Sequence, residues 1–264
     1  MLTRVLVAGT LVAVLTATVA ANHSWENYHW ARSANPFTLQ VGDNVSGVWD
    51  SHLDVAIYDW SRSSVLKLTK VAGSAAKQRN CRPTAGRIEV CNYRYGSNGW
   101  LGIAQVWITG DHITQGITKL NDTYFNMATY DKPEWRQLVI CQEIGHDFGL
   151  DHQDEIFGNG NLGTCMDYTN SPLSNQHPNQ HDYDQLESIY AHLDSFTTVG
   201  ASKLPSAMPP AMGQIDFETP AQWGRKIHTS ANGRREIYEL DFGRRHRVIT
   251  HVFWADPDGD EHAH

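Results

Sequence analysis

The sequence predicts an α+β fold. The first half of the chain is predicted to form a twisted mixed sheet with one helix packed on it, and two further helices are predicted later in the chain. The first observation is a set of apolar or alternating stretches in the first half of the chain, which are typical of strands. They cover residues 65–71, 87–95, 100–108 and 113–121. The second observation is the helical spacing of apolar residues before and after this set. With 264 residues and 41% hydrophobic content, the chain can form one globular core and an additional small module.

The first predicted helix covers residues 46–60. Its apolar residues recur three or four positions apart, which places them on one helical face. They are Trp49, Leu53, Ala56, Ile57 and Trp60. We expect this face to pack on the sheet, because aromatic residues with helical spacing usually belong to a core.

Two further helices are predicted after the strands. One begins near Pro133, a residue suited to a first helical turn, and Asp131 and Glu134 have the spacing of a capping box around it. The last helix follows a long loop and is predicted to begin with Asp182 and Gln185 as capping residues. The chain thus changes from a sheet to a part that contains helices.

Residues 1–21 have the pattern of a secretory signal peptide. Arg4 supplies the positive start, and the apolar run of residues 5–19 is shorter than the roughly 20 residues that a spanning helix needs. We therefore expect an exported, extracellular protein that is not anchored in a membrane. The formal net charge of −8 disfavours nucleic acid and anionic lipid as partners, because both attract basic patches.

Composition also divides the mature chain. Residues 22–199 are expected to form the main domain, and residues 200–213, rich in Ala, Ser, Pro, Met and Gly, to form a linker. Residues 214–264 then read as a small β-rich module with a hairpin at Asn232 and Gly233. Such a module is small for independent stability, so we expect it to dock on the main domain. Its aromatic residues, Trp223, Tyr238, Phe253 and Trp254, are more often core than a binding surface.

Four cysteines in an exported chain indicate two disulfides, for which three pairings exist. We expect Cys81 to pair with Cys91, which closes a short hairpin. We expect Cys141 to pair with Cys165, which ties the second helix to a later segment. Free buried thiols are less expected in an oxidising environment, and zinc ligation by cysteine is less expected because no CxxC pair occurs.

The stretch QEIGHDFGLDH, residues 142–152, matches a zinc-binding pattern except at its first position. In the pattern HExxHxxGxxH, two histidines share one helical face, a glutamate between them is the general base, and a third histidine returns after a glycine turn. Four positions of the pattern are matched, by Glu143, His146, Gly149 and His152. Gln142 takes the place of the first histidine. The pattern predicts a metal site in which one ligand is unusual.

With a second motif, these residues resemble the metzincin metallopeptidases. In the sequence CMDY, Met166 lies fourteen residues after His152, a spacing suited to the methionine turn beneath the metal in that family. Tyr168 follows, as in the astacin and serralysin branches. The resemblance covers roughly residues 22–193 and implies a metzincin-like zincin fold with a smaller subdomain after the active-site helix. It also implies that Met166 forms an apolar floor and that Tyr168 stabilises the oxyanion.

The resemblance further implies a Zn²⁺ ion bound by Gln142, His146 and His152, with water at the open position. Glu143 would be the general base, and an extended peptide or protein substrate would add to the strand of residues 100–108 as an edge strand. The activity expected is that of a secreted zinc-dependent metalloendopeptidase. A glutamine oxygen is a poorer zinc donor than imidazole, so we expect weaker metal binding.

The sequence departs from the family in other respects, and two alternatives stay open. We find no cysteine-containing pro-segment and no clustered histidines like those of the structural zinc site in matrixins, and His112 is expected to be a surface residue. The first alternative is a pseudo-peptidase, a secreted protein-binding or peptide-binding module without turnover. The second is a hydrolase that acts on an amide outside proteins.

Overall fold

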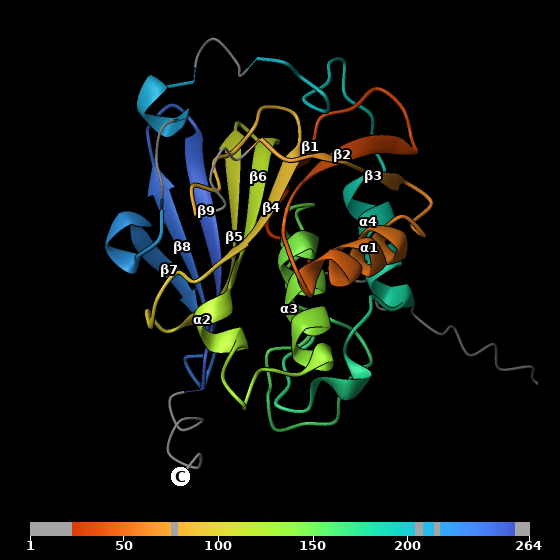
Figure 1. The fold of residues 1–264 in the computed structure, drawn as a ribbon. Helices are drawn as coiled ribbons and strands as arrows, with labels where there is room; N and C mark the ends of the chain where they lie inside the picture. Colours follow the sequence, from red (N-terminus) through yellow and green to blue (C-terminus); the bar gives the residue numbers. More distant parts are fainter. Residues whose placement is uncertain (1–22, 75–78, 204–207, 214–216, 257–264) are drawn as a thin grey trace, which may run out of the picture.

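A computed structural model describes residues 23–74, 79–203, 208–213 and 217–256 (Figure 1). Within these residues the protein has one large mixed sheet and few helices, which is compatible with the predicted α+β class. The predicted signal peptide, residues 1–21, lies outside the described residues. No helix in the described part of the chain is long and apolar enough to cross a membrane.

The strands form a single sheet in the order β3-β2-β4-β6-β5-β9-β8-β7, and β1 pairs with β6 beside this path. The pairings from β3 to β6 and that of β1 with β6 are parallel. Those from β6 through β5, β9 and β8 to β7 are antiparallel. The strands are β1 (His29–Trp30), β2 (Phe37–Asn44), β3 (Leu66–Ala72), β4 (Ile88–Tyr93), β5 (Trp100–Thr109), β6 (His112–Asn121), β7 (Arg225–Thr229), β8 (Arg235–Asp241) and β9 (His246–Trp254).

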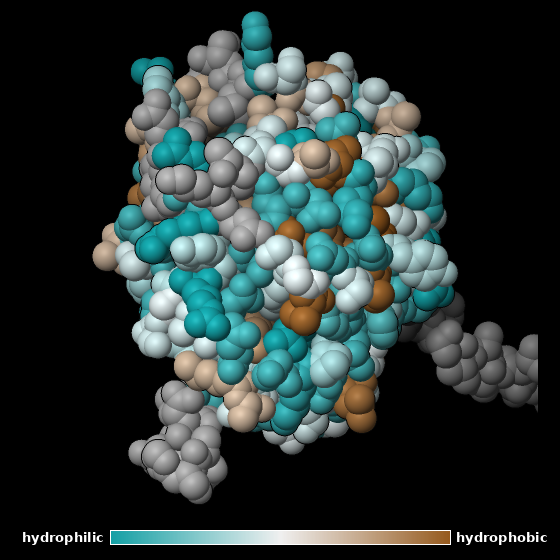
Figure 2. Space-filling view, viewed as in Figure 1, coloured by the Kyte–Doolittle hydropathy of each residue, from teal (hydrophilic) through white to brown (hydrophobic). Residues whose placement is uncertain are grey.

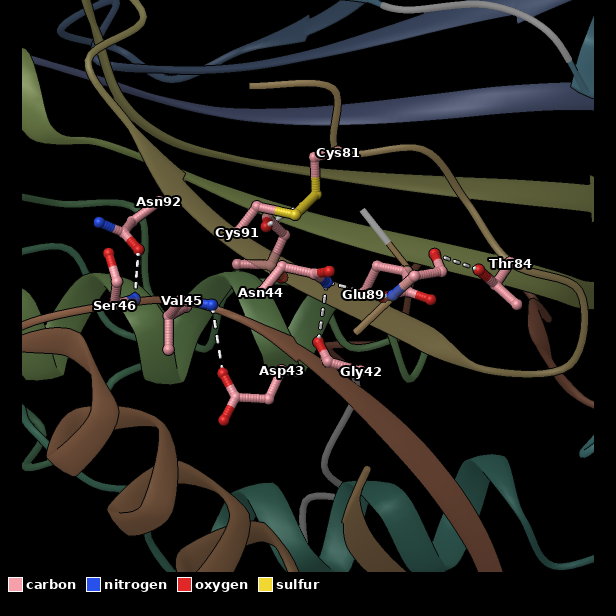
Figure 3. Close-up of a disulfide and its surroundings, with 12 residues drawn as sticks. Gly42, Asp43, Asn44, Val45, Ser46, Cys81, Thr84, Glu89, Cys91 and Asn92 are labelled. Atoms are coloured by element: carbon pink, nitrogen blue, oxygen red, sulfur yellow. Dashed lines mark hydrogen bonds between the residues drawn. A yellow bond between two sulfur atoms is a disulfide. The ribbon is translucent and has the colours of Figure 1, made fainter. Parts of the chain in front are cut away.

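The sequence pattern does not predict β2, although this strand lies between β3 and β4. Its first half alternates buried and exposed residues, but its second half contains Gly42 and Asn44, which are typical of turns. The polar end is satisfied inside the sheet, because Asn44 Nδ2 donates to Glu89 Oε2 at 2.7 Å and to the Gly42 carbonyl at 3.2 Å (Figure 3). A buried carboxylate on β4 therefore supports a strand that local propensity disfavours.

Both predicted disulfides are present. Cys81 pairs with Cys91 on β4, next to the contact between Asn44 and Glu89 (Figure 3). Cys141 of helix α3 (Pro133–His146) pairs with Cys165. The Cα atoms of each pair are 5.9 Å apart, within the range that a disulfide spans.

Helices α1, α3 and α4 gather on one side of the sheet (Figure 1). In the same view, Figure 2 shows that hydrophilic residues predominate on the outer surface and separate small apolar groups. These helices therefore direct most of their apolar side chains inward. The helices are α1 (Trp49–Trp60), α2 (Asp122–Phe125), α3 (Pro133–His146) and α4 (Gln180–Ile189), with short 3₁₀ turns η1 (Pro172–Ser174), η2 (Pro210–Gly213) and η3 (Pro220–Gln222).

The starts of α3 and α4 correct the predicted capping. α3 begins at Pro133 as predicted, but Asp131 accepts a hydrogen bond from Arg136 at 2.6 Å instead of capping the helix. In α4 the cap is Asn179, which accepts the Asp182 amide while the Asp182 carboxylate accepts the Asn179 amide at 2.7 Å. Asp182 is thus the third residue of the helix and not its cap, because the chain becomes helical one turn earlier than expected.

Apolar residues fill both faces of the sheet. One core lies beneath α1 and α3, and a second lies on the opposite face against the segment that leads into β7. Trp107 Nε1 donates to the Met212 carbonyl at 2.7 Å, and Met212 is fully buried. Trp223 and Tyr238 also belong to the second core, as expected for core aromatics. The strands after residue 213 extend the main sheet, so this segment shares its cores with the preceding part.

Strand β5 is not an edge of the sheet. β9 pairs with it antiparallel over the whole of Trp100–Thr109, while β6 pairs on its other side. Ala104 lies opposite His251, and Ile103 lies opposite Val252. The expectation that a substrate adds to β5 as an edge strand is therefore wrong for this conformation, because the chain's own C-terminal strand takes that place.

Candidate active site

Helix α3 carries three of the motif residues and is buried from Trp135 to His146. Gln142 and His146, four residues apart, project from one face of this helix. Gly145 permits close packing here, because a Cβ atom at this position would lie 2.7 Å from Met166 Sδ and 2.9 Å from Trp60 Cζ2. Met166 therefore lies against the helical turn that carries His146.

Gly149 reverses the chain after α3. Its φ of +91° lies in the left-handed region that glycine favours, and a Cβ atom would lie 2.1 Å from the Tyr28 carbonyl oxygen. No other residue fits this turn without a backbone shift. The turn returns the chain so that His152 Nε2 lies 3.1 Å from His146 Nε2. The two histidines of the motif are thus brought together.

In each of these two imidazoles, Nε2 faces the other ring and Nδ1 has a separate partner. His146 Nδ1 lies 2.9 Å from the Leu150 carbonyl, to which it donates, so its Nε2 carries the lone pair. His152 Nδ1 lies 3.0 Å from the Tyr168 hydroxyl and 3.3 Å from Asp151 Oδ1. Burial lowers the pKa of both histidines well below the usual value. Neutral imidazoles with fixed outer nitrogens are the form that binds a metal.

Gln142 has one satisfied and one unsatisfied polar atom. Its Nε2 donates to the Cys165 carbonyl at 2.7 Å, and the adjacent disulfide between Cys141 and Cys165 fixes that carbonyl relative to α3. Its Oε1 is buried and has no hydrogen-bond partner among the described residues. A buried carbonyl oxygen without a partner is costly unless another group binds it. An amide oxygen of this kind is a possible metal donor.

Glu143 is 1% exposed, and neither of its carboxylate oxygens has a hydrogen-bond partner among the described residues. Burial raises the pKa of this carboxyl to about 8, against the opposing effects of the Arg235 charge and the nearby Ala104 amide. Gly102 on β5 makes room for the side chain, since a Cβ atom there would lie 3.0 Å from Glu143 Cγ. A buried carboxyl with a raised pKa and no partner is characteristic of acid–base groups.

Two residues that the sequence analysis did not select lie over this site. The imidazole of His251 on β9 stacks on that of His146, with centroids 4.1 Å apart and planes inclined by 9°. Arg235 on β8 is fully buried, and its guanidinium lies 4.9 Å from the centre of the Tyr168 ring. Burial lowers the pKa of Arg235 well below its usual value. The alternation of His251 with Ile249 and Phe253 was the available sign that this histidine faces inward.

The motif residues are closed off from solvent by these strands. Gln142, Glu143 and His146 are 0%, 1% and 2% exposed, and His152 is 8% exposed. A cavity lined by His146 and His251 has a volume of about 10 Å³, near the lower limit for a single water molecule. A peptide has no access to Glu143 while β8 and β9 stay in place.

Other groups in the described part of the chain also have the chemistry to hold a metal. Each brings together at least three histidine or carboxylate donors within 4.8 Å. In one of them, the inward atoms His23 Nε2, His181 Nδ1 and Asp182 Oδ1 are buried and have no hydrogen-bond partner among the described residues. The groups are His23, His181 and Asp182; His29, His112 and Asp194; and Asp151, His152 and Glu155.

Comparisons with known proteins do not assign this chain to a family. The sequence matches no protein-family model, and a search of curated proteins finds no similar sequence. The site is therefore interpreted from its own residues and distances.

Proposed function

We propose that this protein is a secreted zinc-dependent metalloendopeptidase of the metzincin type, held latent by its own C-terminal strands. The observation that carries the proposal is the buried Glu143 carboxyl group, whose oxygens have no hydrogen-bond partner among the described residues. It follows directly on Gln142, whose Oε1 is also unsatisfied, and belongs to the same helix as His146. A pseudo-peptidase does not need a buried glutamate side chain at this position, since the residue does not ligate the metal.

The donor set supports zinc with one weak ligand. His146 Nε2 and His152 Nε2 are 3.1 Å apart, close to the separation of two donors on one zinc ion. Gln142 would contribute its Oε1 as the third ligand. A bound Zn²⁺ would polarise the scissile carbonyl and lower the pKa of a bound water to roughly 7. Because amide oxygen is a weaker zinc donor than imidazole, we expect a lower affinity than a three-histidine site would have.

Two side chains of the protein would carry out proton transfer and stabilise the oxyanion. Glu143 would take a proton from the attacking water and return it to the leaving amine. Tyr168 now contacts His152 Nδ1 at 3.0 Å, so it would rotate away to donate its hydroxyl hydrogen to the developing oxyanion. Burial raises the pKa of Tyr168 well above its usual value, which keeps this hydroxyl protonated. Peptides and proteins are the proposed substrates.

The second candidate is a pseudo-peptidase that binds a protein or peptide without cleaving it. Two observations favour it: Gln142 stands in a ligand position, and β8 and β9 cover the site with Arg235 and His251. In this candidate the covered conformation is permanent. In the peptidase it is a latent form that opens.

The experiment that separates the candidates is digestion of a peptide library by zinc-loaded Val252→Asp protein. Val252 belongs to the second core, on the sheet face opposite the site, so this change loosens β9 without altering a site residue. We expect cleavage that a chelator stops. In the same background, Glu143→Gln should reduce cleavage by about 10²–10⁴-fold while zinc stays bound. Zinc-loaded, loosened protein that cleaves nothing would support the pseudo-peptidase.

A further inference from the structure

Three histidines and one aspartate meet at a second place, and none of them belongs to the candidate active site. His29 lies in β1, His112 begins β6, and His192 and Asp194 follow α4. His112, expected to be a surface residue, has a side chain that is 24% exposed, and its ring packs edge-on against that of His29 with centroids 4.8 Å apart. Strand pairing between β1 and β6 places His29 directly opposite His112. Three segments far apart in the sequence thus supply four possible ligands.

The donor atoms of His29, His112 and Asp194 lie within 4.8 Å of one another, and that of His192 lies close to His29 and Asp194. His192 Nε2 lies 3.1 Å from His29 Nε2 and 3.9 Å from Asp194 Oδ1. His112 Nε2 lies 3.2 Å from Asp194 Oδ1, and His29 Nε2 lies 3.5 Å from Asp194 Oδ2. In a tetrahedral zinc site with bonds of about 2.0–2.1 Å, donor atoms are roughly 3.3 Å apart. The measured separations therefore have the size that a zinc site requires.

Neighbouring groups already orient two of the ligands. His29 Nδ1 lies 2.6 Å from the Asn27 carbonyl, to which it donates, so the lone pair is on the inward Nε2. Arg32 holds the carboxylate of Asp194, with Nη1 at 3.0 Å and the backbone amide at 3.2 Å from Oδ2. Asp194 Oδ1 is left to face His112 and His192. Such outer contacts are typical of histidine and carboxylate ligands in metal sites.

Hydrogen bonds without a metal explain only part of this arrangement. His192 can donate to His29, and His112 can donate to Asp194 Oδ1. These two bonds do not account for the approach of His29 Nε2 to Asp194 Oδ2 at 3.5 Å, or for the convergence of His29, His112 and Asp194 within 4.8 Å. A cation bound by His29, His112 and Asp194 accounts for their convergence, and His192 Nε2 is close enough to His29 and Asp194 to approach it as a fourth ligand.

The cluster also has a route for metal entry. His29 and His192 line an open cavity of about 550 Å³, together with the carboxylate residues Glu26 and Asp111. The side chain of His192 is 55% exposed, whereas that of His29 is 5% exposed. A hydrated cation can therefore reach the outer ligand first and then the buried one.

We propose that His29, His112, His192 and Asp194 form a structural Zn²⁺ site. The structure brings His29, His112 and Asp194 together as three ligands, and His192, whose exposed side chain can turn toward them, would complete a tetrahedral donor set without an open position for water or substrate. The ion fastens β1 and β6 to the segment that follows α4. This inference does not depend on the peptidase function, because the site shares no residue with residues 142–168.

The test uses the full mature chain with His146→Gln and His152→Gln, which removes the candidate catalytic metal. After removal of all metals, Co²⁺ is added alone, and the bound metal and the visible absorption are measured. We expect one Co²⁺ per chain with the intense visible absorption of tetrahedral coordination. Zn²⁺ at 100 times its Kd should raise the Tm by about 5–10 °C.

His192→Gln is the decisive variant, because its exposed position lets the protein fold without it. It should weaken Co²⁺ binding at least about tenfold and abolish the zinc-dependent rise in Tm. The matched control is His177→Gln, a histidine whose side chain is 57% exposed and which lies outside the cluster. It should bind Co²⁺ like the parent. A parent that binds no Co²⁺, or binding that His192→Gln leaves unchanged, would overturn the proposal and, in the latter case, point to the group of His23, His181 and Asp182.

Discussion

The imidazole of His251 lies parallel to that of His146, with 4.1 Å between the ring centroids. The two residues are far apart in the sequence and meet because β9 pairs with β5 beside α3. A residue from the last strand thus covers a residue of the zinc motif. The contact links the position of β9 to access to the candidate active site.

The first prediction concerns this link. Val252→Asp places a carboxylate in the second core, where burial of a charge without a partner is costly, and so weakens the docking of β9. We expect zinc-dependent peptide cleavage to rise at least about tenfold over the natural protein, since a tenfold change corresponds to about 1.4 kcal/mol of opening free energy. Initial rates on a fluorogenic peptide library measure the effect.

Val48→Asp is the matched control, because it makes the same substitution at a residue that is 58% exposed. It should leave the cleavage rate unchanged. Equal rates for the natural protein and Val252→Asp, with both folded and zinc-loaded, would show that β9 does not hold the protein latent.

The second prediction concerns Gln142. Replacement by histidine supplies the imidazole donor that zinc prefers, so Gln142→His should bind zinc at least about tenfold more tightly. Gln142→Leu keeps the approximate volume and removes the donor, so it should bind more weakly than the natural protein. Competition with a chromophoric chelator measures all three affinities. Equal affinities for the glutamine and leucine forms would mean that Oε1 is not a ligand.

The third prediction concerns the disulfide between Cys141 and Cys165. It closes a loop with a sequence separation of 24, for which chain entropy predicts a stabilisation of about 3.4 kcal/mol. Replacing both cysteines by alanine should lower the free energy of unfolding by roughly this amount in urea titrations at pH 7. Zinc affinity should fall as well, because the disulfide no longer holds the residue 165 carbonyl, which accepts from Gln142 Nε2 at 2.7 Å, in a fixed position relative to α3.

The comparison variant removes Cys81 and Cys91, whose separation is 10 and whose predicted contribution is about 2.7 kcal/mol. This variant should leave the zinc affinity unchanged, since that disulfide lies on β4 rather than on α3. If the zinc affinity is the same with and without the disulfide at Cys141, that disulfide does not contribute to zinc binding.

The parts of the site that the sequence predicts correctly depend on local geometry. Gln142 and His146 share a helical face because of their spacing, and Gly149 takes the positive φ of +91° that the motif requires. Met166 packs against α3 at Gly145, where the sequence analysis expected an apolar floor. Arg235 and His251 were missed because strand pairing over a long sequence separation brings them to the site, and local patterns do not specify such register.

The same distinction applies to the fold. The periodicity of α1 and the apolar character of β5 and β6 are local, and these elements lie close to their predicted positions. The position of β9 beside β5 depends on which strand edges are free, so a pattern can indicate the strand without indicating its neighbour. The cluster of His29, His112 and His192 was missed for this reason, since only the folded chain brings its three segments together.

The last prediction concerns the pH dependence of stability through His52. Burial lowers the pKa of His52 below 6.5, and the nearby Arg136 charge adds to this effect, while the hydrogen bond to Gln137 opposes it. Below pH 6.5 the unfolded chain therefore binds more protons at this residue than the folded chain does. The contribution of His52 to stability is complete above pH 6.5 and is lost as the pH falls toward the lower folded-state pKa. Glutamine at this position does not titrate, so His52→Gln should remove this part of the acid sensitivity.

Urea unfolding of the metal-free protein between pH 5 and pH 7.5 measures the effect. Other buried histidines also contribute to the slope of the natural protein, so the informative quantity is the difference between the natural protein and His52→Gln. Relative to the natural protein, the variant should become more stable as the pH falls from 6.5 to 5, because the buried imidazole no longer resists protonation. A difference that is independent of pH would mean that His52 titrates alike in the folded and unfolded chains.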